Sequence, residues 1–191
     1  MFTDRRSKKI AVIANCILNQ NAKADAFAQY PAMTPGIVEL LNKYNFGIHQ
    51  APCPEIYATG IRRFWATHEQ YNNRGTRRAF EEAAYFLLDQ IEDFITHGFK
   101  VILIGIDGSP SCGIDFTDTD INGIWLGKPD LTDASFTTDF AYKKSPGVFI
   151  KAIQKELTNR ELQQLPSFGL NFDISNETLD LSKLEDFLKT I

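Results

Sequence analysis

The sequence predicts an α/β fold with three layers, in which a mostly parallel, Rossmann-like sheet has helices on both faces. Two observations lead to this prediction. Short runs that contain apolar residues and are typical of strands recur along the chain, and helical patterns with three- and four-residue spacing lie between them. Strands that alternate with helices favour a parallel sheet, because a parallel connection needs a crossover long enough to hold a helix.

Four runs are predicted as strands. Residues 9–14 and 46–51 are the first two. Residues 101–106 are the third, and their Val-Ile-Leu-Ile stretch has the length and composition of a strand that is buried on both faces. Residues 167–174 are the fourth.

Helical patterns separate these strands. Thr34 as N-cap and Pro35 at the first helical position predict the first helix start. Gly98 is placed to end the longest helix. The predicted helices cover residues 34–44, 73–97, 145–157 and 181–188. Residues 56–71 and 114–146 show no clean period, and we interpret them as loops that cover or form a functional site.

Length and charge limit the range of functions. With 191 residues, one domain over 1–191 is expected, with residues 1–8 frayed. The net charge of −4 argues against nucleic acid or an anionic membrane as the main partner. The sequence contains neither a run long enough to span a membrane nor a signal-peptide core, so we expect a cytoplasmic protein. It does not indicate an oligomeric state.

The three cysteines share one position in the predicted fold. Cys16, Cys53 and Cys112 each follow the C-terminal end of a predicted strand. Ligands of open parallel sheets bind beyond that edge, so three neighbouring strands would bring the thiols into one crevice. The alternative is three unrelated buried thiols, which are common in proteins. An odd number of cysteines without secretory context argues against a disulfide framework.

Three convergent thiolates suit zinc or an iron–sulfur cluster. A cubane cluster takes four ligands, and a missing fourth cysteine would leave one iron open for chemistry. Zinc would need a fourth ligand such as His49, His68 or Glu55. None of these residues stands at a distance from a cysteine that is typical of a zinc-binding motif.

Three motifs resemble the family of 2-thiouracil desulfurase and its relatives: residues 15–18 (NCIL), 52–55 (PCPE) and 109–113 (SPSCG). The helix start at 146–149 (PGVF) is also similar, and the resemblance covers about residues 9–157. The chain departs from the family pattern after Cys16, where residues 23–26 (KADA) replace an Arg-Tyr-Asp-Gly motif. Such differences beside the cysteines are expected to shape the substrate pocket.

The resemblance implies an iron–sulfur-dependent desulfidase with a [4Fe–4S] cluster on Cys16, Cys53 and Cys112. The open iron would take sulfur from the thiocarbonyl group of a small thiolated molecule, without net oxidation or reduction. The resemblance also implies that Glu55 and Ser109 are the acid–base residues.

Four further polar residues are candidates for substrate binding: Asn15, Asn19, Ser111 and Arg62. For each of them a role in capping a loop, forming a turn or solvating the surface is the alternative. Two other functions also remain open. Cys112 could be the nucleophile of an enzyme without a cluster, or the crevice could bind a small molecule without catalysis. Neither a Gly-x-Gly-x-x-Gly nor a Walker sequence supports a dinucleotide or nucleoside triphosphate as ligand.

Overall fold

The computed structural model describes residues 4–25, 27–63, 66–119, 141–172 and 179–191. Its centre is a four-stranded sheet in the order β2-β1-β3-β6, and all three strand pairs are parallel. The strands are β1 (Lys9–Ile13), β2 (Gly47–Gln50), β3 (Lys100–Ile106) and β6 (Ser167–Leu170). All four predicted strands are therefore confirmed, although positions 173 and 174 of the last lie outside the described residues.

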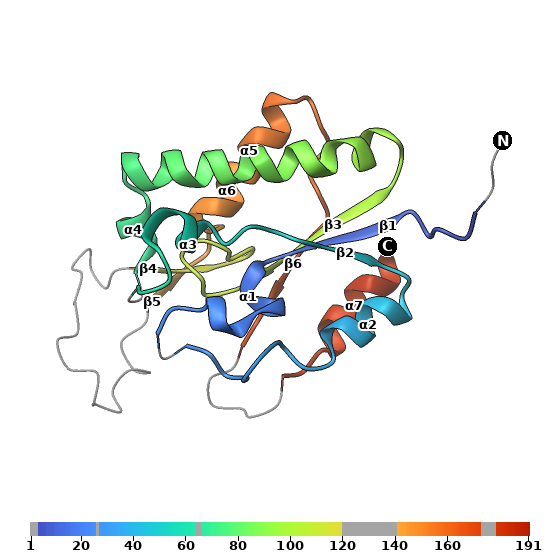
Figure 1. The fold of residues 1–191 in the computed structure, drawn as a ribbon, viewed down its shortest axis with the longest axis horizontal. Helices are drawn as coiled ribbons and strands as arrows, with labels where there is room; N and C mark the ends of the chain where they lie inside the picture. Colours follow the sequence, from blue (N-terminus) through green and yellow to red (C-terminus); the bar gives the residue numbers. More distant parts are fainter. Residues whose placement is uncertain (1–3, 26, 64–65, 120–140, 173–178) are drawn as a thin grey trace.

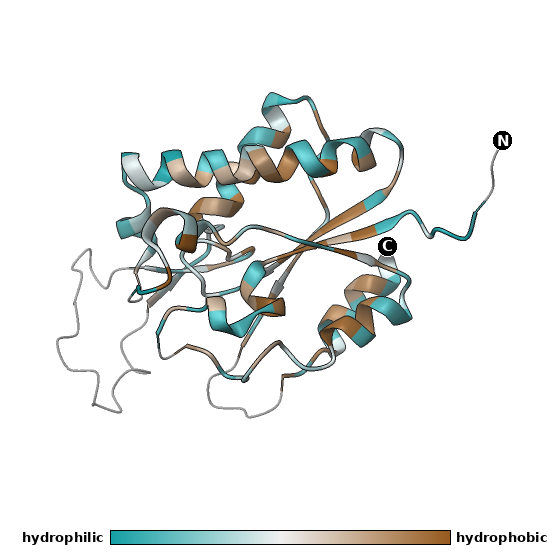
Figure 2. Cartoon of the chain, viewed as in Figure 1, coloured by the Kyte–Doolittle hydropathy of each residue, from teal (hydrophilic) through white to brown (hydrophobic). Residues whose placement is uncertain are grey.

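Helices cover both faces of this sheet. The long α5 (Arg74–Thr96) and α6 (Val148–Asn159) lie on one side, and α2 (Ile37–Lys43) and α7 (Ser182–Thr190) lie on the other (Figure 1). Apolar residues occupy the strands and the inward sides of these helices (Figure 2). The predicted three-layer α/β fold is confirmed. It arises because each amphipathic helix can bury its apolar side only against the sheet.

The first helix start was predicted two residues too early. α2 begins at Ile37, after Gly36, which has a left-handed φ of 72°. Thr34 is buried and accepts a hydrogen bond from the Gln20 side chain (3.3 Å), while its N–H donates to the carbonyl of Ile17 (2.9 Å). Thr34 therefore anchors the segment after β1 and does not cap the helix.

The predicted loops contain short regular elements. The segment after β1 forms α1 (Asn15–Leu18) and a 3₁₀ turn, η1 (Gln20–Ala22). The segment after β2 forms α3 (Pro54–Thr59) and α4 (His68–Tyr71). Within 114–146, β4 (Thr117–Thr119) and β5 (Ala141–Lys143) pair as an antiparallel hairpin, and positions 120–140 lie outside the described residues. None of the helices in the described part of the chain has the length and apolar composition that a membrane span requires.

Candidate active site

The three cysteines lie at the switch point of the sheet. From β1, in the middle, the chain passes to β2 on one side and then returns to β3 on the other. Cys16 follows β1, Cys53 follows β2 and Cys112 follows β3. All three line one cavity of about 160 Å³, which we call the cysteine cavity. Its described lining comprises Asn15, Cys16, Lys23, Ala24, Phe27, Gln29, Cys53, Pro54, Glu55, Arg63, Ala66, Ile106, Asp107, Gly108, Ser109, Pro110, Ser111, Cys112, Asp118, Tyr142 and Phe172.

Side-chain amides tie the first two cysteine loops together. Asn15 Nδ2 donates to the carbonyl of Ala51 (3.3 Å), and Gln50 Nε2 donates to the carbonyl of Asn15 (3.2 Å). The buried Gln20 donates to the carbonyl of Cys16 (2.9 Å). These bonds fix the backbone on both sides of the crevice between β1 and β2.

The loop that carries Cys112 folds back on β3. The N–H of Ile106 donates to the carbonyl of Cys112 (2.9 Å), and the first turn of α6 holds the loop from the other side. There the N–H groups of Phe149 and Ile150 donate to the carbonyl of Ser111 (3.0 and 3.2 Å). Gly147 permits this contact, because a Cβ there would lie 2.9 Å from Cys112 N and would overlap the Ser111 carbonyl.

A hydrogen-bonded chain joins Glu55 to two cysteines. Arg63 Nε donates to Glu55 Oε2 (2.9 Å), and Ser111 Oγ donates to Glu55 Oε1 (2.6 Å). Arg63 Nη2 lies 3.8 Å from Cys53 Sγ, and Ser111 Oγ lies 3.4 Å from Cys112 Sγ. The side chains of Arg63 and Glu55 are only 5% and 13% exposed, so this ion pair is largely buried.

Ser109 extends this chain by one hydroxyl. Its Oγ accepts from the backbone N–H groups of Cys112 (3.0 Å) and Ser111 (3.3 Å), and it lies 3.2 Å from Ser111 Oγ. Because Ser111 donates to Glu55, the proton of Ser109 can be directed to Ser111. Ser109 is half-buried whereas Ser111 is 1% exposed, so Ser109 is the more accessible end of the chain.

All three thiols are free, and their surroundings favour the protonated form when no metal is bound. Burial raises the pKa of Cys16 to about 12, and it also raises the pKa values of Cys53 and Cys112. A metal would remove these protons, since thiolates are the form that binds it. Within the described ranges, no three Cys, His, Asp or Glu side chains form a group that could hold a single metal ion.

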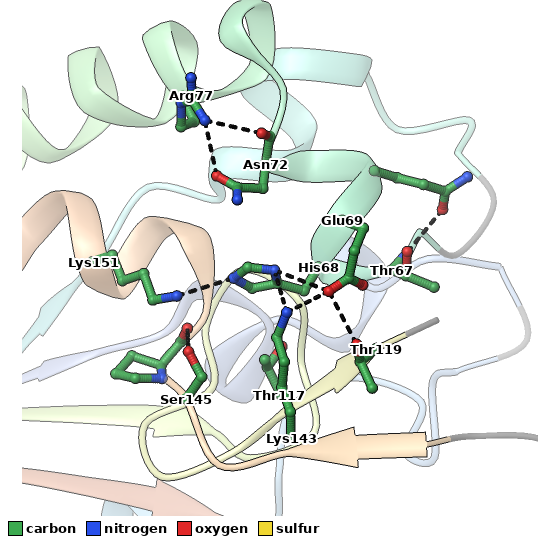
Figure 3. Close-up of polar contacts among 12 residues, drawn as sticks. Thr67, His68, Glu69, Asn72, Arg77, Thr117, Thr119, Lys143, Ser145 and Lys151 are labelled. Carbon is green, nitrogen blue, oxygen red and sulfur yellow. Dashed lines mark hydrogen bonds and ion pairs between the residues drawn. The ribbon is translucent and has the colours of Figure 1, made fainter. Parts of the chain in front are cut away.

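The β4–β5 hairpin brings Asp118 and Tyr142 to the cavity wall. Its attachment to α4 and α6 centres on the buried His68 (Figure 3). Lys143 Nζ lies 2.8 Å from His68 Nδ1, and Lys151 Nζ lies 3.2 Å from His68 Nε2. Burial, followed by the two lysine charges, lowers the pKa of His68. The hairpin is therefore held by an imidazole that favours its neutral form.

Seven of the predicted site residues line the cysteine cavity: Asn15, Cys16, Cys53, Glu55, Ser109, Ser111 and Cys112. Asn19 and Arg62 are exposed and are not part of its lining. Asn19 instead accepts a hydrogen bond from the N–H of Asn21 (3.2 Å) at the start of η1. Of the two adjacent arginines, sequence analysis chose Arg62, whereas Arg63 lines the cavity. Lys23 was missed, since nothing in one lysine among many indicates that its side chain faces inward.

Comparisons with known proteins agree with the motifs. A family model described as "Putative 2-thiouracil desulfurase" matches residues 8–175. "Uncharacterized protein MJ0003" of Methanocaldococcus jannaschii is 33% identical over 109 residues, which are 57% of this chain and 70% of that protein.

A solved structure, the [4Fe-4S]-dependent thiouracil desulfidase TudS, is 20% identical with a TM-score of 0.46. The alignment covers 83% of this chain and 89% of that one, but a score this low does not establish a common fold. The family match, in contrast, extends over most of the chain and includes all three cysteine motifs. The chain thus belongs to the 2-thiouracil desulfurase family and is an enzyme of the desulfurase type.

Proposed function

We propose that this enzyme is a [4Fe–4S]-dependent desulfidase that hydrolyses the thiocarbonyl group of a small thiolated molecule. One observation carries the proposal: three free cysteines, each at the end of a neighbouring parallel strand, line one cavity together with a buried carboxylate. Family membership supports the same reaction class.

The donor set fits a cubane cluster better than a single ion. Three cysteines line the cavity, yet the described residues contain no group of three ligands close enough to share one metal. In a cluster each thiolate binds a different iron, so the ligands need not meet at one point. Cys16, Cys53 and Cys112 would hold three irons and leave the fourth without a protein ligand.

When bound, the cluster would supply a Lewis-acidic iron that accepts the departing sulfur. The reaction balances as a hydrolysis. The oxygen of water forms a bond to the thiocarbonyl carbon, the carbon–sulfur bond breaks with its electrons going to sulfur, and the two protons of water leave with the sulfide. No external oxidant or reductant is required.

The protein would move the protons through its own hydroxyls and carboxylate. Glu55, which is paired with Arg63, is placed to accept a proton that arrives from Ser109 through Ser111. The same chain can return the proton to the leaving sulfur. Asn15 and Ser111, which line the cavity, remain candidates for contact with the substrate.

This arrangement supports the cluster enzyme over a Cys112 nucleophile. Cys112 is buried, which raises its pKa, and the described lining of the cavity contains no histidine that could take its proton. An activated cysteine needs a lowered pKa or an adjacent base.

Anaerobic reconstitution with iron and sulfide tests the proposal. The wild-type chain should turn brown, bind iron and sulfide in equal amounts, and convert 2-thiouracil or another cyclic thione to the oxygen analogue plus sulfide. Cys112→Ala should fail to hold the cluster, whereas Glu55→Gln should hold it and lose at least ~10²-fold in kcat, the contribution typical of a general base. A wild-type chain that stays colourless and free of iron would overturn the proposal.

A further inference from the structure

Two cationic side chains belong to the described lining of the cysteine cavity, and only one of them has a polar partner among the described residues. Arg63 binds Glu55 and also donates to the carbonyl of Ala22 (2.6 Å). Lys23 has neither a hydrogen-bond acceptor nor a carboxylate partner among the residues that the structure describes. Its ammonium lies 4.2 Å from the centre of the Phe172 ring. Burial lowers the pKa of Lys23, as expected for an ammonium that loses water without gaining an anion.

The carboxylates around the cavity do not compensate this charge. Glu55 is bound on both oxygens by Arg63 and Ser111. Asp107 Oδ1 accepts from two backbone N–H groups of the following loop (2.9 Å each). Asp118, the third carboxylate of the lining, forms no ion pair with Lys23. The cavity therefore presents one cation that the described protein groups leave uncompensated.

The backbone fixes Lys23 at the cavity. Its N–H donates to the carbonyl of Gln20 (3.1 Å), and the preceding carbonyl, that of Ala22, is held by Arg63. Gln20 is itself buried, at 1% exposed, and bonded to Cys16 and Thr34. Lys23 thus differs from a surface lysine on a loose loop, since the segment that holds the first cysteine also fixes its position.

The rest of the wall suits a flat ring. Phe27, Tyr142 and Phe172 line the same cavity as Lys23. Aromatic side chains pack well against planar heterocycles, and a cation at the edge of such a surface favours a negative substituent on the ring. An occupant that satisfies all of these groups is both planar and anionic.

We propose that Lys23 binds an anionic substituent, such as a carboxylate, on a planar thiolated heterocycle and so selects charged substrates over neutral ones. This inference rests on the proposed desulfidase function and adds the substrate class. It assigns the role to Lys23, and not to the exposed Arg62, because Lys23 lines the cavity and has no polar partner within the described ranges of the chain.

Paired substrates and paired variants test the inference. The reconstituted enzyme is assayed with 2-thiouracil and with 2-thiouracil-6-carboxylate, at a pH below the ring pKa of both. Lys23→Gln should lower kcat/KM for the carboxylate at least ~10-fold more than for 2-thiouracil, mainly through KM, because a charge-assisted hydrogen bond is lost. Lys23→Arg should retain most of the preference, and the exposed control Lys155→Gln should leave both activities unchanged.

Binding of the oxygen analogue uracil-6-carboxylate, measured by calorimetry, gives a readout without turnover. Lys23→Gln should weaken it at least ~10-fold while the iron content and the visible spectrum of the cluster stay as in the wild type. Equal losses for both substrates, or loss of iron, would overturn the inference, since Lys23 would then serve the cluster or the fold. Lys23-dependent binding in a wild-type chain that takes up no iron and turns over neither thione would refute the desulfidase but support the anion site.

Discussion

Replacing Gly147 by alanine is predicted to loosen the loop that carries Cys112. Gly147 has a φ of −64°, which alanine adopts freely, so the effect is steric alone. A Cβ would lie 2.9 Å from Cys112 N, whereas ordinary contacts begin at 3.4 Å. That difference requires the loop and α6 to separate by at least 0.5 Å, and the overlap with the Ser111 carbonyl requires more.

The expected cost is that of overpacking, about 1–3 kcal/mol, which lowers the Tm of a chain of this size by roughly 2–12 °C. Since the same movement shifts Cys112, Gly147→Ala should also retain less iron after reconstitution. Thermal unfolding of the metal-free chain and iron analysis measure the two effects.

Gly75→Ala is the matched control. Gly75 lies in the first turn of α5, where a Cβ would be 3.4 Å from Asn73 Oδ1, an ordinary contact. Its Tm should stay equal or rise, because alanine favours a helix over glycine by up to about 1 kcal/mol. If Gly147→Ala matches the wild type in both Tm and iron content, the contact between α6 and the Cys112 loop does not position the cysteine.

Three further predictions concern the polar groups of the site. Arg63→Met should lower the free energy of unfolding by about 3–5 kcal/mol in chemical denaturation, because it leaves the carboxylate of Glu55 buried without its cation. The control Arg62→Ala, at an exposed position, should change the free energy of unfolding by less than about 0.5 kcal/mol. An equal effect of the two changes would contradict the buried ion pair. Ser111→Ala should keep the cluster but lower kcat by about 10²-fold, since it breaks the link to Glu55; undiminished single-turnover rates would remove the relay from the mechanism. His68 has a folded pKa below its unfolded value of about 6.5, so acid favours the unfolded chain, and wild-type stability should fall as the pH drops from 7 to 5. His68→Gln should lose less stability over that range. The difference should be about 1.4 kcal/mol, or roughly 3–6 °C in Tm, for each unit by which the folded and unfolded pKa values of His68 differ. Identical slopes in thermal melts would argue against a neutral buried imidazole.

The sequence by itself determined the sheet and the meeting of the cysteines. Residues 9–14 and 101–106 could be predicted as strands because a strand buried on both faces needs a continuous apolar stretch, whereas the edge strands β2 and β6 are more polar and more exposed. Since parallel strands end at one edge, the position of Cys16, Cys53 and Cys112 after three predicted strands was enough to predict a shared crevice. Family motifs then indicated the reaction class.

The contacts of individual polar side chains could not be predicted from the local sequence pattern, because tertiary packing determines them. Thr34 has the sequence signature of a helix cap, yet it is buried against Gln20, because a buried hydroxyl pairs with whatever donor packing brings near. Arg62 and Arg63 are adjacent and chemically identical, and the contacts of Arg63 with Glu55 and with the carbonyl of Ala22 distinguish them.

The hydrogen bond between Ser111 and Glu55 joins residues that are 56 positions apart in the chain. Lys23 became a candidate for substrate binding because the described residues around it include no polar partner. Contacts of this kind form between the ends of separate strands. The spacing of residues within one segment does not indicate such contacts. The three cysteines of the site could therefore be predicted from the sequence, whereas the charged residues around them became evident only in the folded structure.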